Sequence, residues 1–213
     1  NARRRSVKTL VKASLFVTCL VDQFYPEVGE SVVKVLRRLG VEVDFPAGQT
    51  CCGQPALNSG FVKQAKTIAR GFLEQFSDSE YVIIPSGSCG SMLKVFNPEL
   101  FHDDPTAMQQ AQDLAERTYE FSQFLVEVLG VVDVGASFQG KVIYHASCHL
   151  LRELGATSES QSLIRAVHGA ELIELEDATE CCGFGGTFSV KYPEISIAIL
   201  ESKLRSIEAS GAD

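Results

Sequence analysis

The sequence lacks two features that would place it in large classes of proteins. It has no apolar stretch that approaches the roughly 18 residues a membrane-spanning helix needs, so we expect no membrane span. It is also short of positive charge, because 19 lysines and arginines face 27 aspartates and glutamates and the net charge is -8. Binding to nucleic-acid phosphates depends on Lys and Arg, so we expect no nucleic-acid partner.

The basic residues that do cluster lie at the start of the chain: Arg3, Arg4, Arg5, Lys8 and Lys12. A nucleic-acid arm or a twin-arginine export signal would carry such a cluster. The apolar run that follows, residues 13–21, is short for a signal core and is interrupted by Thr18 and Cys19. We therefore interpret the basic cluster as a solvated leader before the first strand and expect a cytoplasmic protein.

The cysteines are the most informative residues, and there are seven: Cys19, Cys51, Cys52, Cys89, Cys148, Cys181 and Cys182. An odd number that includes two adjacent pairs makes a poor disulfide framework. A chain of 213 residues is also long enough to fold without disulfide bonds, and no secretory signal is recognisable. Reduced thiols that act as ligands or redox groups therefore fit better than disulfides. The alternative is that they are buried free thiols acting as small apolar side chains.

The chain repeats itself. Cys19 and Cys148 each follow a short apolar run, and the tripeptide Cys-Cys-Gly occurs at 51–53 and again at 181–183. From Cys19 to Cys148 is 129 positions, and from Cys51 to Cys181 is 130. Two landmarks with nearly one offset predict a duplicated unit. We place the halves at 1–135 and 136–213, with a joint near residues 130–140 where glycines interrupt the pattern.

Apolar periodicity predicts strands that alternate with helices. The expected strands are 13–18, 41–45, 81–84, 141–144 and 171–175, and the expected helices are 27–39, 61–76, 106–129, 159–167 and 187–209. Such alternation is typical of parallel α/β proteins. We therefore predict an α/β fold made of two pseudo-repeated Rossmann-like halves. Ligands of open α/β sheets gather beyond the carboxyl ends of the strands, so the cysteines of each half should converge there on a metal site.

The cysteine spacing of the first half bears on the kind of metal. Four thiolates, from Cys19, Cys51, Cys52 and Cys89, suit zinc or an iron–sulfur cluster. Structural zinc sites usually use Cys-x-x-Cys pairs, whereas adjacent cysteines point apart. A cluster offers several irons to diverging sulfurs, so the spacing favours iron–sulfur and leaves zinc open. The glycine after each pair suits a tight turn or a close approach of the backbone to a cluster sulfide.

The second half holds three cysteines and no counterpart of Cys89, which would fall near position 219, past Asp213. We expect this set to stop short of its last cysteine or to use another ligand, for which His145 and His149 are the nearest candidates. Either histidine could instead donate a hydrogen bond to a cluster sulfur. Lys191 is a candidate for holding a carboxylate substrate, and its plainer interpretation is a solvated helix lysine.

The duplicated pattern resembles the cysteine-rich (CCG) domain of heterodisulfide reductase B subunits and glycolate oxidase iron–sulfur subunits. Longer strings are similar to the lactate utilization protein A family, at residues 14–22, 51–56, 58–60, 85–89, 129–136 and 181–191. The resemblance implies an iron–sulfur subunit of an oxidoreductase complex. Such a complex would oxidise L-lactate or another 2-hydroxy acid to the 2-oxo acid and pass electrons through cysteine-bound clusters.

The resemblance also implies two partners, an iron–sulfur protein and a third subunit. Heterodisulfide reductase B subunits end each motif with Cys-x-x-Cys and bind a noncubane four-iron cluster, but here Cys89 is followed by Gly-Ser-Met. A 4Fe–4S cluster of the ordinary kind is therefore as compatible as a noncubane one. The alternative function is a zinc-binding structural or scaffold module of a redox complex.

Overall fold

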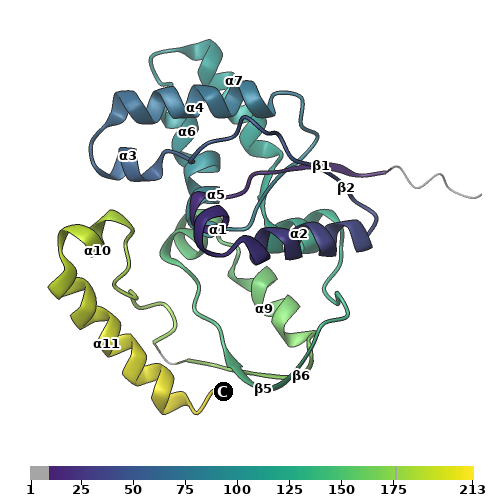
Figure 1. Cartoon of the computed structure of the whole chain (residues 1–213), viewed down its shortest axis with the longest axis vertical. Coiled ribbons are helices and arrows are strands. Elements are labelled where there is room, and N and C mark those ends of the chain that lie inside the picture. Colours follow the sequence, from purple (N-terminus) through teal and green to yellow (C-terminus); the bar gives the residue numbers. More distant parts are fainter. Residues whose placement is uncertain (1–9, 176) are drawn as a thin grey trace, which may run out of the picture.

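The computed structural model describes residues 10–175 and 177–213, and the basic residues from Arg3 to Lys8 lie outside this part. The first half contains a parallel four-stranded sheet with the strand order β2-β1-β3-β4, and the second half contains a parallel pair, β5-β6 (Figure 1). The strands are β1 (Lys12–Leu15), β2 (Glu42–Asp44), β3 (Val82–Ile84), β4 (Thr118–Glu120), β5 (Ser137–Ile143) and β6 (His168–Ile173).

The helices of the first half are α1 (Cys19–Phe24), α2 (Pro26–Arg38), α3 (Gln54–Asn58), α4 (Val62–Phe76), α5 (Gly87–Ser91), α6 (Asn97–Leu100), α7 (Pro105–Glu116) and α8 (Phe121–Gln123), with π-helical turns η1 (Met92–Phe96) and η2 (Phe124–Val128). Those of the second half are η3 (Leu150–Leu154), α9 (Thr157–Arg165), α10 (Thr187–Lys191) and α11 (Pro193–Ser210). None of the described helices is long and apolar enough to cross a membrane.

Apolar clusters cover both faces of the four-stranded sheet at its central strands, where successive side chains point to opposite sides. Val82 and Ile84 of β3 belong to one apolar cluster with Phe16 and Phe72, whereas Ile83 belongs to the other. Helices α4 and α7 supply the first cluster, and α2 and η2 the second. Phe16 and Phe72 meet edge to face with ring centroids 5.7 Å apart, a favoured aromatic geometry.

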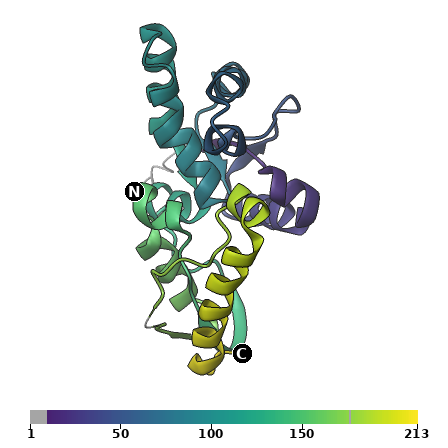
Figure 2. The same cartoon turned by 90° about the vertical axis from the view of Figure 1, so that its left-hand side faces the viewer.

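The second half is packed more thinly than the first. Its buried apolar cluster consists of Ala146, Leu150 and Ala156. Helix α11 lies apart from β5 and β6 over most of its length in Figure 1, with Figure 2 giving the view turned by 90°, and the chain reaches β5 after it, where Asp213 hydrogen-bonds Lys141. The helix exposes a row of large apolar side chains. These are Ile195, Ile197, Leu200 and Leu204.

The α/β class and its parallel strands are confirmed, and most of the expected elements are found within a few residues of their predicted bounds. The single long helix expected at 106–129 is wrong. Helix α7 ends at Glu116, Thr118–Glu120 forms the edge strand β4 beside β3, and helical structure resumes at Phe121. Strand β4 and the helices on either side of it all contain apolar residues, so the apolar periodicity of the sequence shows no break at β4. Thr and Tyr, two of its three residues, do favour strands.

One further prediction needs correction in the second half. The helix expected at 187–209 is divided at Tyr192, because Pro193 lacks a backbone N–H and begins a new helix instead. In the range 130–140, where we place the joint, residues 130–136 form no helix or strand and β5 begins at Ser137. Gly140 lies inside β5 at a shift in its register with β6.

Candidate metal centre

The first set of cysteines lies where the chain leaves the carboxyl ends of β1, β2 and β3. Cys19 is the first residue of α1, which is N-capped by Thr18. Cys51 and Cys52 lie in the loop between β2 and α3, and Cys89 lies in α5. Because parallel strands end at one edge of a sheet, these segments meet although they are far apart in sequence.

The four thiols of this set crowd together. The Sγ atoms of Cys19 and Cys51 are 4.0 Å apart. Cys19 is exposed, Cys51 is half-buried, and Cys52 and Cys89 are buried. Burial and then the neighbouring Cys51 raise the pKa of Cys19, and contact with Cys52 followed by burial raises the pKa of Cys51.

The two buried thiols differ in acidity. Contact with Cys51 lowers the pKa of Cys52, but contact with Cys89 and burial outweigh it and raise this pKa to about 12. Contact with Cys52 lowers the pKa of Cys89. Cys89 is therefore the most acidic thiol of the set, and the thiols around it oppose a second thiolate. A bound cation would remove that opposition, because it compensates thiolate charge.

A glutamine that the sequence analysis missed holds the loop of Cys51 against β1. The side-chain Oε1 of Gln49 accepts a hydrogen bond from the backbone N–H of Val17 (2.8 Å). Its Nε2 donates to the carbonyl oxygens of Leu15 (3.1 Å) and Pro46 (3.0 Å). These bonds fix the segments that lead to Cys19 and Cys51. No pattern in the sequence distinguishes this glutamine.

A second glutamine and a histidine join the other cysteine segments. The Nε2 of Gln54 donates to the carbonyl oxygen of Ser88 (3.1 Å) and lies 3.3 Å from Nε2 of His149. The Nδ1 of His149 is 3.4 Å from Oγ of Ser91. His149 is a neighbour of Cys148 in sequence, whereas its ring lies beside the segments that carry Cys52 and Cys89. Gln54 directly follows the Cys-Cys-Gly turn, which is the signal that could have identified it.

The second set consists of Cys148, Cys181 and Cys182. Cys181 is exposed and the other two are half-buried. Burial raises the pKa of Cys148, the charge of Cys181 raises it further, and the guanidinium of Arg152 lowers it. The thiols of Cys148 and Cys181 are in contact, and Cys182 follows Cys181 in the chain.

His145 connects the two loops of this second set. Its Nδ1 lies 2.8 Å from the carbonyl oxygen of Ala178. A donating Nδ1–H leaves a lone pair on Nε2, and this buried Nε2 has no hydrogen-bond partner in the part of the chain that the structure describes. His145 can therefore offer a ligand atom near Cys148. Lys191, by contrast, is exposed on α10.

The glycine after each cysteine pair is required by its backbone. Gly53 and Gly183 have φ angles of 90° and 83°, which disfavour a side chain. A Cβ at Gly183 would lie 2.4 Å from the carbonyl oxygen of Ser196 in α11, and one at Gly53 would lie 3.3 Å from Cγ2 of Ile68 in α4. The expected tight turn is present, and the close neighbour of each glycine is a helix.

Within residues 10–175 and 177–213, no group of three or more His, Cys, Asp or Glu side chains has the ready-made geometry of a metal site. The chemistry of the donors does fit a soft metal, because thiols are the preferred ligands of zinc and of iron–sulfur clusters. The first set offers four thiols, and the second offers three together with Nε2 of His145.

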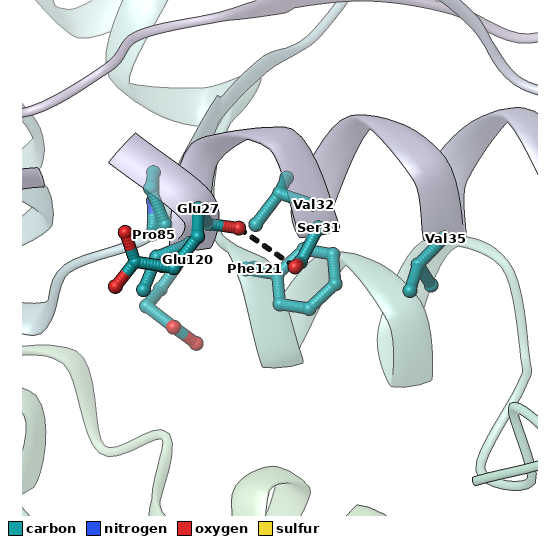
Figure 3. Close-up of a pocket in the computed structure, with 8 residues that line it drawn as sticks. Glu27, Ser31, Val32, Val35, Pro85, Glu120 and Phe121 are labelled. Atoms are coloured by element: carbon teal, nitrogen blue, oxygen red, sulfur yellow. Dashed lines mark hydrogen bonds between the residues drawn. The ribbon is translucent and has the colours of Figure 1, made fainter. Parts of the chain in front are cut away.

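A cavity of about 340 Å³ lies near the same edge of the first sheet but contains no cysteine (Figure 3). It is lined by α2 and by residues that follow or end β3 and β4: Glu27, Val28, Ser31, Val32, Val35, Pro85, Glu120 and Phe121. Glu27 and Glu120 gather at one end of it (Figure 3), and burial raises the pKa of Glu120. The lining contains two carboxyl groups and no lysine or arginine, so it offers no cation to an anionic ligand.

Fold and site together define a duplicated cysteine-rich α/β protein. The cysteine-rich domain (CCG) matches residues 13–94 and again residues 142–213, which confirms the duplication. The chain belongs to the lactate utilization protein A family. It is 53% identical over 203 residues to lactate utilization protein A of Geobacillus kaustophilus, covering 95% of this chain and 84% of that protein. It is 51% identical to lactate utilization protein A of Bacillus subtilis, covering 95% and 85%.

Proposed function

We propose that this protein is the iron–sulfur subunit of a cytoplasmic oxidoreductase complex that oxidises L-lactate, or another 2-hydroxy acid, to the 2-oxo acid. One observation carries the proposal: the thiols of Cys19, Cys51, Cys52 and Cys89 meet at one edge of a parallel sheet. Membership of the lactate utilization protein A family supports the substrate class.

The chain's own residues would hold and tune the centres. Cys19, Cys51, Cys52 and Cys89 would hold one cluster, and Cys148, Cys181 and Cys182 would hold a second, with His145 as a further ligand. Iron–sulfur clusters supply reversible one-electron transfer, with a potential set by burial and by hydrogen bonds to sulfur. Two features of this chain would set the potential. Cys52 and Cys89 are buried, and the backbone N–H of Gly183 lies 3.3 Å from Sγ of Cys181.

The two halves, 1–135 and 136–213, would then each carry one centre. A subunit of this kind needs partners that exchange electrons with it, and we propose an iron–sulfur protein and a third subunit in that role. The acidic character of the chain, with a net charge of -8, argues against nucleic acid as a partner.

One observation favours a second candidate, a zinc-binding scaffold module. Around a tetrahedral zinc with Zn–S bonds of about 2.3 Å, two sulfurs lie roughly 3.8 Å apart. The 4.0 Å between the Sγ atoms of Cys19 and Cys51 is close to that value. A four-iron cluster places its terminal thiolates on different irons and therefore further apart, so binding one would require Cys19 and Cys51 to separate.

Metal analysis of protein purified and reconstituted without oxygen distinguishes the two candidates. The redox proposal predicts iron with acid-labile sulfide and a broad absorbance near roughly 400 nm from thiolate–iron charge transfer. The scaffold candidate predicts zinc near one ion per half, no sulfide, and loss of folded structure when a chelator is added. A colourless protein that holds only zinc after reconstitution would refute the redox proposal.

A further inference from the structure

The second cysteine set opens onto a cavity of about 670 Å³ between α11 and the loop that precedes Cys181. Its lining combines cationic, hydroxyl and apolar side chains with the thiol of Cys181. Those that matter here are Arg152, Thr179, Cys181, Ile195, Ile199 and Lys203. This cavity brings a cysteine and cationic side chains together.

The two cations in the lining are not equivalent. Lys203 is only 3% exposed, and its Nζ donates to the carbonyl oxygen of Asp177 and lies 3.5 Å from Oδ1 of the same residue. Its charge is therefore neutralised. Arg152 is exposed, and among the described residues no carboxylate forms an ion pair with it. Arg152 is thus the cation that remains available to an anion in the cavity.

Arg152 shares the cavity with a cysteine of the second set. It lines the same cavity as Cys181, so its side chain and that thiol border one space. A guanidinium presents parallel N–H donors that match the two oxygens of a carboxylate. Ile195 and Ile199 offer an apolar wall, and Glu180, which also lines the cavity, can accept a hydrogen bond from a hydroxyl group.

We propose that this cavity binds a small 2-hydroxy or 2-oxo acid, with Arg152 holding its carboxylate beside Cys181. The inference rests on the proposed function and deepens it, because it assigns the substrate class to particular residues at the second cysteine set. The cavity in Figure 3 is the wrong place for such an acid because it is lined by Glu27 and Glu120 and by no lysine or arginine. In the cavity at the second set, Arg152 and Lys203 balance the carboxylates of Asp177 and Glu180. Lys191, the cation that the sequence suggested, is exposed on α10.

The first test is equilibrium binding of L-lactate and of pyruvate, measured by titration calorimetry on reconstituted and on metal-free protein. Arg152→Gln should weaken binding about 10- to 100-fold, the usual loss for charge-assisted hydrogen bonds. Arg152→Lys should retain part of the affinity because it keeps the charge. Lys191→Gln is the matched control and should bind like the unaltered protein. Circular dichroism establishes that each variant is folded.

The second test locates the ligand. In metal-free protein, L-lactate should slow alkylation of Cys181 by iodoacetamide, read by mass spectrometry, and should leave Cys19 in the other half unaffected. Arg152→Gln should abolish this protection. The inference is overturned if unaltered protein binds neither acid, if Arg152→Gln binds as well as unaltered protein, or if Cys181 is not protected. Iron and sulfide content, measured on the same preparations, decides separately whether the redox proposal stands.

Discussion

Replacing Gly87 with alanine should destabilise the contact through which the two halves meet beside Cys89. A Cβ at Gly87 would lie 2.6 Å from Cβ of Leu150, 2.9 Å from Oγ of Ser147 and 3.2 Å from Cα of Leu150. Leu150 is only 6% exposed and cannot withdraw into solvent, so α5 and η3 must separate. Overpacking of this kind costs about 1–3 kcal/mol, and we expect Gly87→Ala to lower the free energy of unfolding by that amount.

Gly71→Ala is the matched control for this prediction. Gly71 lies in α4, and a Cβ there meets nothing within 4 Å. Alanine is more favourable than glycine inside a helix by about 0.5–1 kcal/mol, so this variant should be more stable than the unaltered protein. Urea unfolding followed by circular dichroism measures both changes. If Gly87→Ala were as stable as Gly71→Ala, the packing of α5 against η3 would be refuted.

Two other predictions concern stability. Gly183→Ala should cost at least about 2 kcal/mol, because it combines a positive φ with a clash against α11. Gly155→Ala, which has a left-handed backbone and a Cβ that meets nothing within 4 Å, should cost only about 1–2 kcal/mol; equal thermal midpoints would contradict this. Burial holds the pKa of Glu120 above its ordinary value of 4.5, so the folded protein keeps this proton longer than the unfolded chain, and stability falls as pH rises from 4.5 through the folded pKa. Glu120→Gln should flatten that fall in urea midpoints taken across this range, and an unchanged slope would count against a buried carboxyl at this position.

Much of the fold follows from local patterns in the sequence. Strand β3 is a short, wholly apolar run that ends before Pro85, and α2 has a proline at its start and a glycine after its end, so both were predictable. The edge strand β4 was not, because its three residues interrupt a helical pattern without changing its apolar period. Only pairing with β3, a contact distant in sequence, makes this segment a strand.

The candidate site, like the fold, was only partly predictable from the sequence. The cysteines were identifiable because thiols are rare and their spacing repeats, and their convergence followed from parallel strands. Gln49 and Arg152 were not identifiable, since a glutamine or an arginine in a polar segment carries no pattern. His149 was misplaced because nearness in sequence to Cys148 says nothing about which set its ring faces once η3 packs against α5.

The most direct test of the account is the iron and acid-labile sulfide content of cysteine variants reconstituted without oxygen. The central claim is that sulfurs from distant segments bind one centre in each half. Cys89→Ser and Cys182→Ser should therefore each remove about half of the iron and sulfide, and the double variant should remove nearly all of it. Ser59→Ala, a control beside the first set that changes no sulfur, should retain both in full. Unchanged iron and sulfide in both single variants would contradict the claim.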